Sequence, residues 1–289
     1  MINRAWVQQH LAVGERVIAI EQLHGGLTAD MRRLTIAAPD GGLRHLVLRT
    51  YVDRPDAAEW LSRESHALTE LATTAVPAPG LVAVAEPSLL MTWLPGRTVL
   101  TDAGLAARIP ALARQLVAIH AVEPVERPRP FVTLTTADTV VTPAGADWSA
   151  AIDMIRRGHP PYEGRFLHRD YQPGNVLFEG NRLTAVVDWA STSWGPTDLD
   201  VAHCATNLAL LHGPAWAHQF IAAYSRSGGH LSAHRQYWLI RDALSFSEEV
   251  EGATQPWRDS TRPDLTPRTI EARLDAYLRS LLHGVQMNG

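Results

Sequence analysis

The chain's most informative segment reads Phe166-Leu167-His168-Arg169-Asp170-Tyr171-Gln172-Pro173-Gly174-Asn175-Val176-Leu177-Phe178. Asp170 is followed five residues later by Asn175, and a second carboxylate, Asp188, comes thirteen residues after that, at the end of the apolar run 183–187. A carboxylate can accept the proton of a hydroxyl group, and hard oxygen ligands suit Mg²⁺. An Asp and an Asn in a turn can also simply bond the backbone, but the second carboxylate favours a chemical site.

The segment resembles the catalytic loop of the aminoglycoside phosphotransferase and choline kinase-like family of small-molecule kinases. The matching phrases are His168 to Phe178, Val187-Asp188-Trp189 and Gly195-Pro196-Thr197-Asp198-Leu199-Asp200-Val201-Ala202. The resemblance is closer to this family than to eukaryotic protein kinases, because Asp188-Trp189-Ala190 replaces Asp-Phe-Gly and no Ala-Pro-Glu phrase occurs. It extends from Gly25 to about His212, and it departs from the family's pattern at Pro196, where a proline stands one place early.

The resemblance implies a division of roles among these residues. Asp170 would be the catalytic base, and Asn175 and Asp188 would hold Mg²⁺, as two ions, against ATP or GTP as phosphate donor. Three further residues would order the catalytic loop: His168, Arg169 and Asp200.

The strand predicted over 45–51 carries a cation among apolar residues. Alternation puts Val47, Arg49 and Tyr51 on one face. On the helix that follows, Glu64 lies between apolar residues at a spacing of four and therefore needs a partner. We expect that partner to be Arg49, which stands where the family usually has its phosphate-binding Lys. The alternative is an ordinary Glu at a helix edge.

Other nucleotide contacts are predicted in two segments of the first lobe. Gly25, Gly26 and Thr28 lie between two predicted strands, where backbone N–H groups could cover phosphates, although most Gly-Gly pairs are only hairpin turns. Met91 and Trp93 would belong to the connector that faces the nucleotide base.

The 289 residues contain no lysine; all 26 basic residues are arginine, against 30 acidic ones. This excludes lysine Schiff-base chemistry and the Walker-A lysine. A single cysteine, Cys204, excludes an intramolecular disulfide and multi-cysteine zinc sites, and we expect it to be a core residue. With a net charge of −4 and no basic block, nucleic acid and membranes are not expected partners.

The pattern of elements predicts an α+β fold, and the family resemblance implies a two-lobed, protein-kinase-like one. Strands are expected over 15–52, 81–84 and 89–94, with one helix over 55–73. The later helices are expected over 102–120, 147–157, 200–211, 216–225, 233–247 and 267–282. We therefore expect a nucleotide-binding lobe over 1–94, a hinge at about 92–97 and a helical lobe over 98–289.

The acceptor is less explicit in the sequence. Two sets of acidic residues favour a cationic hydroxylated substrate such as an aminoglycoside: Asp188, Asp198 and Asp200, and Asp242, Glu248, Glu249 and Glu251. Trp189 could stack on such a substrate. The glutamates could equally be a solvated helix end. Antibiotic inactivation is the leading expectation, and the alternatives are a metabolic kinase for choline, an amino alcohol or a sugar, or a non-catalytic binding module. A cytoplasmic location is expected, because no signal peptide or apolar span is evident.

Overall fold

A computed structural model describes residues 4–23, 29–52, 55–140, 145–247 and 250–284, and the chain forms two compact units. The first contains Met1–Pro95 and Ala185–Ser191, and the second contains Gly96–Thr184 and Thr192–Gly289. The sequence analysis assigned everything after residue 98 to one lobe. The structure corrects this, because Ala185–Ser191 returns to the first unit and brings Asp188 with it.

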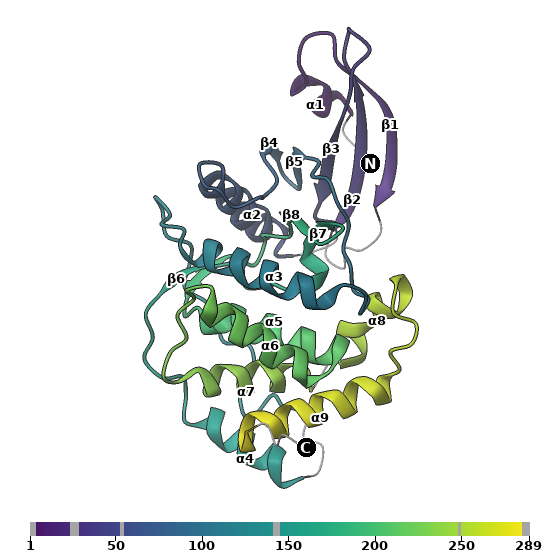
Figure 1. Cartoon of the computed structure of the whole chain (residues 1–289). Coiled ribbons are helices and arrows are strands. Elements are labelled where there is room, and N and C mark those ends of the chain that lie inside the picture. Colours follow the sequence, from purple (N-terminus) through teal and green to yellow (C-terminus); the bar gives the residue numbers. More distant parts are fainter. Residues whose placement is uncertain (1–3, 24–28, 53–54, 141–144, 248–249, 285–289) are drawn as a thin grey trace. The chain divides into compact units, whose positions relative to one another are not determined.

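The first unit is built on a five-stranded antiparallel sheet with the order β1-β2-β3-β5-β4 (Figure 1). Its strands are β1 (Arg16–Leu23), β2 (Asp30–Ala37), β3 (Leu43–Thr50), β4 (Leu81–Ala85) and β5 (Ser88–Thr92). The predicted meander and the two later strands are thus confirmed. In the central strand β3, Arg49 lies opposite Met31 of β2 and Leu89 of β5.

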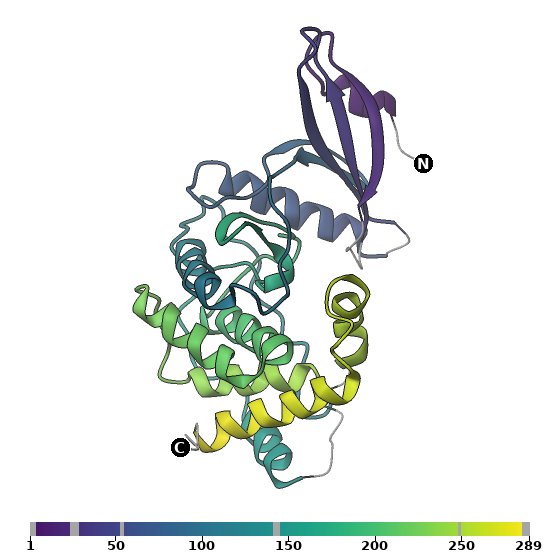
Figure 2. The same cartoon turned by 45° about the vertical axis from the view of Figure 1, so that its right-hand side comes forward.

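The two faces of this sheet have different chemistry. Leu46 and Leu48 of β3 lie in an apolar core with Val7 of α1 (Arg4–Gln9), a short helix that the sequence analysis did not predict. The alternate residues Arg49 and Tyr51 point to the other face, where they reach α2 (Ala57–Leu71), the helix expected over 55–73. Figure 2 shows these two helices beside the sheet. The alternation therefore places a cation on the face that α2 covers.

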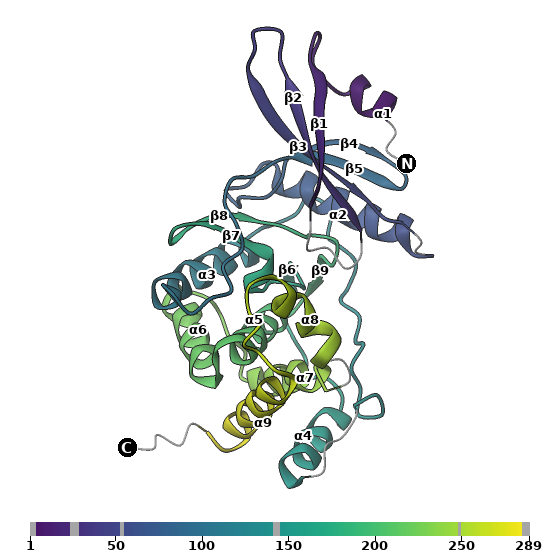
Figure 3. The same ribbon diagram turned by 90° about the vertical axis from the view of Figure 1, so that its right-hand side faces the viewer.

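The second unit is mainly helical. Its helices are α3 (Leu105–His120), α4 (Ala146–Arg156), α5 (Asp198–His212), α6 (Pro214–Arg226), α7 (Arg235–Ser245), α8 (Val250–Ser260) and α9 (Pro267–His283). Every helix predicted beyond residue 98 is confirmed, and only α8 was not expected. Helix α5 is buried along most of its length and packs against α6, α7 and α9 (Figure 3). None of the helices in the described ranges is both long and apolar enough to cross a membrane.

Short strands hold the predicted catalytic loop. They are β6 (Arg165–Leu167), β7 (Val176–Glu179), β8 (Arg182–Val186) and β9 (Ser193–Gly195), with a 3₁₀ turn at Pro173–Asn175 before β7. β6 pairs with β9, and β7 pairs with β8 across a turn in which Gly180 has a φ of 60°. The loop is therefore fixed by a strand on each side.

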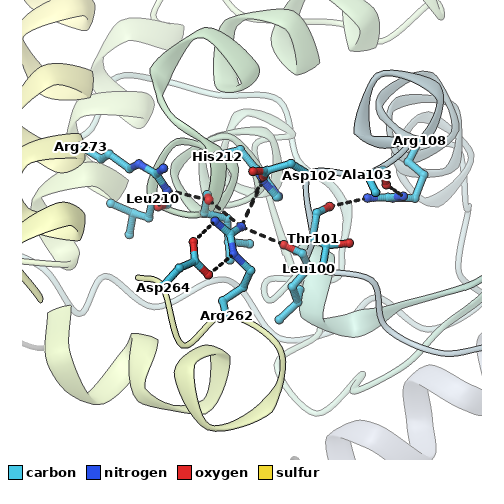
Figure 4. Close-up of polar contacts among 11 residues, drawn as sticks. Leu100, Thr101, Asp102, Ala103, Arg108, Leu210, His212, Arg262, Asp264 and Arg273 are labelled. Carbon is cyan, nitrogen blue, oxygen red and sulfur yellow. Dashed lines mark hydrogen bonds and ion pairs between the residues drawn. The ribbon is translucent and has the colours of Figure 1, made fainter. Parts of the chain in front are cut away.

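Two arginines bind the carboxyl end of α5 (Figure 4). Nη1 of Arg262 donates to the main-chain oxygens of Leu100 and Leu211 at 3.0 and 2.9 Å, and its Nε and Nη2 bind Asp264 at 2.9 Å each. Arg273 donates to Leu211 O at 2.7 Å. Cations at a helix carboxyl end satisfy carbonyls that have no partner in the helix. This network ties the segment between α8 and α9 to α5.

Candidate active site

The backbone of the catalytic loop is held by a buried carboxylate. Asp200, in the first turn of α5, accepts hydrogen bonds from the N–H groups of His168 at 2.8 Å and Arg169 at 2.7 Å. Burial alone would raise the pKa of Asp200, but hydrogen bonding to His120 and the positive groups around it lower it. Asp200 is thus an anion that fixes this loop, the position the family resemblance implied.

The loop takes an unusual backbone conformation just before Asp170. Arg169 has a φ of 70°, in the left-handed region that non-glycine residues rarely adopt. The side chain of His168 is buried, and its Nδ1 accepts the N–H of Asp170 at 3.2 Å. Together with the hydrogen bonds to Asp200, this hydrogen bond holds the main chain in its conformation at the point where the Asp170 side chain projects.

Both oxygens of Asp170 are engaged by neighbouring amides, while a third of its side chain is exposed. Nδ2 of Asn175 donates to Oδ2 at 2.8 Å and to the main-chain oxygen at 2.9 Å. Nε2 of Gln172 donates to Oδ1 at 3.0 Å. The structure therefore brings together the two residues that the Asp-x-x-Pro-Gly-Asn spacing singled out.

A second cluster lies within the first unit. Nη1 of Arg49 is 2.9 Å from Oε1 of Glu64 and 2.9 Å from Oδ1 of Asp188, and the Tyr51 hydroxyl donates to Oε2 of Glu64 at 2.8 Å. Arg49 and Glu64 are almost wholly buried, whereas a third of the Asp188 side chain is exposed. The predicted pairing of Arg49 with Glu64 is thus present, and Asp188 joins it.

The charges in this cluster depend on one another. Burial alone would lower the pKa of Arg49, but Glu64 and Asp188 raise it, so the guanidinium stays protonated. Burial raises the pKa of Glu64, against the opposing effect of the Arg49 charge. A buried carboxylate of this kind requires its cation.

The predicted nucleotide contacts are described only in part. Gly25, Gly26 and Thr28 lie outside the described residues. Met91 is buried in β5 opposite Val47, and the N–H of Trp93 donates to the main-chain oxygen of His45 at 3.3 Å. The guanidinium of Arg33 lies 5.3 Å from the centre of a Trp93 ring.

The structure corrects several expectations about the acceptor. Trp189 is fully buried, and its Nε1 donates to Val186 O at 2.9 Å, so its ring belongs to the core of its unit instead of a substrate surface. Asp198 is buried as well and bonds Ser232 N, so, like Asp200, it presents no acidic surface. Glu248 and Glu249 lie outside the described residues. Cys204 is buried, as predicted.

One residue that the sequence analysis passed over stands beside Asp170. Nε2 of His203 lies 3.1 Å from Oδ1 of Asp170, and its Nδ1 lies 3.2 Å from Oδ1 of Asp242. The available signal was the helical spacing of His203 three residues after Asp200, which places both on the same side of α5. Of the two proposed acceptor residues that the structure describes, Asp242 is thus the one brought to Asp170, through this histidine.

The donor atoms fit Mg²⁺. The Asn175 amide uses its nitrogen for Asp170, which leaves the type of oxygen that Mg²⁺ binds, and Asp188 offers a partly exposed carboxylate. Within the described ranges, no three His, Cys, Asp or Glu side chains gather into a ready-made metal site.

The sequence matches a family model, and the fold matches solved structures. A family model described as the phosphotransferase enzyme family matches residues 19–237. No curated protein matches the sequence. A thermostable mutant of aminoglycoside phosphotransferase APH(4)-Ia, in a ternary complex with AMP-PNP and hygromycin B, has 19% identity and a TM-score of 0.63 and covers 98% of this chain and 99% of its own.

Two other solved structures share the fold. The macrolide 2'-phosphotransferase MphH from Brachybacterium faecium has 18% identity and a TM-score of 0.59 over 98% of both chains. A choline/ethanolamine kinase family protein from Mesorhizobium loti has 20% identity and a TM-score of 0.59 over 92% of this chain and 88% of its own. The α+β, protein-kinase-like fold predicted from the sequence is confirmed by these neighbours.

Proposed function

This chain belongs to the phosphotransferase enzyme family and is a small-molecule phosphotransferase, and we propose that it transfers the γ-phosphoryl group of ATP or GTP to a hydroxyl group of an aminoglycoside-like antibiotic. The observation that carries the proposal is the catalytic loop, in which a partly exposed Asp170 is held by Asn175 and by a backbone that Asp200 fixes. This arrangement suits a carboxylate that must meet a hydroxyl group in one orientation.

The proposed reaction is an in-line displacement. The acceptor oxygen forms a bond to the γ-phosphorus as the bond from that phosphorus to the bridging oxygen breaks, which releases the nucleoside diphosphate. Asp170 accepts the hydroxyl proton and later returns it to water. The side chain's exposed third leaves room for the acceptor to approach.

Arg49 is the proposed phosphate ligand of the first unit. Its guanidinium is fixed by Glu64 and remains charged, so it can bind α- and β-phosphate oxygens. Asn175 and Asp188 would hold Mg²⁺, which supplies charge neutralisation for the phosphates when bound. Gly25, Gly26, Thr28, Met91 and Trp93 complete the proposed nucleotide contacts.

The acceptor class rests on the neighbours and on the charges beside Asp170. The neighbours include an aminoglycoside phosphotransferase solved with hygromycin B. In the second unit, Asp170 and Asp242 carry two negative charges around one histidine, which leaves a net negative group when that histidine is protonated. A cationic hydroxylated molecule fits such a group.

The test is a nucleotide-consumption screen against aminoglycosides, macrolides, tuberactinomycins, choline and sugars. Asp170→Asn should lower turnover of the best acceptor by about 10²- to 10⁴-fold, while calorimetric affinity for Mg²⁺-ADP stays near that of the wild type. Asp153→Asn, on the exposed surface of α4, is the matched control and should keep full turnover. Turnover retained in Asp170→Asn, or a wild-type protein that phosphorylates only a metabolite, would contradict the proposal.

A further inference from the structure

His203 lies between two carboxylates that come from different elements. Its Nε2 is 3.1 Å from Oδ1 of Asp170 in the catalytic loop, and its Nδ1 is 3.2 Å from Oδ1 of Asp242 in α7. Only about a fifth of its side chain is exposed. The imidazole therefore links the catalytic carboxylate to a second, more deeply buried one.

This geometry favours the doubly protonated ring. Each ring nitrogen faces a carboxylate oxygen, and both nitrogens can donate only in the imidazolium form. Nδ2 of Asn207 also lies 3.3 Å from Nε2 of His203, but this amide donates to the main-chain oxygen of His203 at 2.8 Å. It therefore does not compete with Asp170 as the partner of Nε2. Burial alone would lower the pKa of His203, but Asp242 and Asp170 raise it to about 10.

The ring is also held in one plane. It stacks on Phe246 with ring centres 6.0 Å apart and an angle of 27° between the planes. Oδ2 of Asp242 is buried and has no hydrogen-bond partner among the described residues, so this carboxylate depends on His203 for its charge balance. A ring fixed by stacking and by Asp242 can orient the group on its other side.

The group on that side is Asp170. Its Oδ1 lies 3.1 Å from Nε2 of His203 and 3.0 Å from Nε2 of Gln172, and its Oδ2 accepts from Nδ2 of Asn175 at 2.8 Å. The loose transition state of phosphoryl transfer requires orientation of the hydroxyl more than a strong base. The contact with His203 therefore serves the position of the carboxylate.

We propose that His203 is a positioning residue, which, as an imidazolium held between Asp242 and Asp170, orients the catalytic carboxylate. The inference rests on the proposed function of Asp170. The other groups near this trio are neutral or lie farther from the ring. Cys204 in α5 and Tyr277 in α9 are neutral, because burial raises the pKa of each. Arg241 interacts electrostatically with Asp242, and His168 interacts with Asp170.

The first experiment measures the charge of His203 directly. Histidine side chains of the full-length wild-type protein are titrated by NMR, and the His203 signal is assigned by its loss in His203→Gln. We expect it to remain protonated up to about pH 9, and in Asp242→Asn we expect it to titrate nearer about pH 6.5. A wild-type His203 that titrates near its ordinary value would overturn the proposal.

The second experiment measures kcat against pH with the best acceptor from the screen. His203→Gln should lower kcat by roughly 10- to 100-fold with little change in Mg²⁺-ADP affinity. The wild type should lose kcat above about pH 9, where His203 releases its proton, and His203→Gln should lack this alkaline limb. His234→Gln, an exposed histidine at the start of α7, is the control and should keep the wild-type profile.

The outcomes separate this inference from the proposed function. If the wild type transfers phosphate and His203→Gln keeps its kcat and pH profile, the positioning role is wrong and the proposed function stands. If the wild type transfers phosphate to no acceptor while His203 is seen to be charged by NMR, the proposed function fails and the catalytic role of His203 fails with it.

Discussion

Replacement of Arg49 by Met removes the cation from the buried cluster of the first unit. Glu64 would keep the Tyr51 hydroxyl, at 2.8 Å, and the backbone hydrogen bond of Trp189, but would lose the guanidinium at 2.9 Å. Breaking a buried pair from one side costs about 3–5 kcal/mol, because an uncompensated charge is left behind. With a urea slope of roughly 2 kcal/mol per molar, the unfolding midpoint, followed by circular dichroism, should fall by about 2 M.

Two companion variants isolate the cause. Arg49→Met combined with Glu64→Gln should recover most of the lost stability, because the buried charge is gone as well. Arg33→Met removes an arginine of the same sheet whose ion pair with Glu21 is on the surface, and should cost about 1 kcal/mol or less.

The loss in Arg49→Met should also depend on pH. The folded pKa of Glu64, already raised by burial, would rise further without the guanidinium, so the folded state would take up a proton before the unfolded chain does. The deficit is therefore full at neutral pH and shrinks as the pH falls through the folded pKa. An Arg49→Met protein as stable as the wild type, or a double variant no better than the single one, would refute the reasoning.

Two further predictions concern the network at the end of α5. Burial, only partly opposed by the hydrogen bond to Asp102, lowers the pKa of His212 to about 4 (Figure 4). As the pH falls, the unfolded chain binds this proton before the folded protein does, so the free energy of unfolding should fall by about 3 kcal/mol from about pH 6.5 to about pH 4. A His212→Asn variant whose free energy of unfolding, measured by urea titration, falls with pH as steeply as that of the wild type would contradict this. Arg262→Met leaves the carbonyls of Leu100 and Leu211 without their donor and should cost about 2–4 kcal/mol; a thermal midpoint within about 2 °C of the wild type would exclude that role.

The features that the sequence predicted well are local. The loop from His168 to Asn175 is a contiguous phrase whose spacing carries its chemistry. The pairing of Arg49 with Glu64 was expected from strand alternation and helical period together with the family resemblance. These patterns depend on residues within one or two neighbouring elements. The thirteen-residue step to Asp188 could be recognised for the same reason, because Asn175 precedes the apolar run 176–178 and Asp188 follows the apolar run 183–187.

Other features depend on contacts between distant parts of the chain or on unfavourable local composition. His203 meets Asp242 because α5 packs on α7, and no sequence pattern marks that contact. Asp198 looked like part of an acidic surface, but burial and a backbone partner give it a structural task. Helix α8 was missed because Gly252 and Pro256 lie inside it, and both disfavour a helix interior.

The separated make-up of the first unit limits how such chains can exchange parts. Asp188 binds Arg49, the main chain of Trp189 bonds Glu64, and Val186 N donates to Pro77 O at 2.8 Å. A genetic crossover near residue 95 would transfer the first stretch of this unit and leave Ala185–Ser191 behind. The segment that is inherited in one piece therefore differs from the folding unit. A chimera of two relatives must take Met1–Pro95 and Ala185–Ser191 from the same parent to keep the buried charges matched.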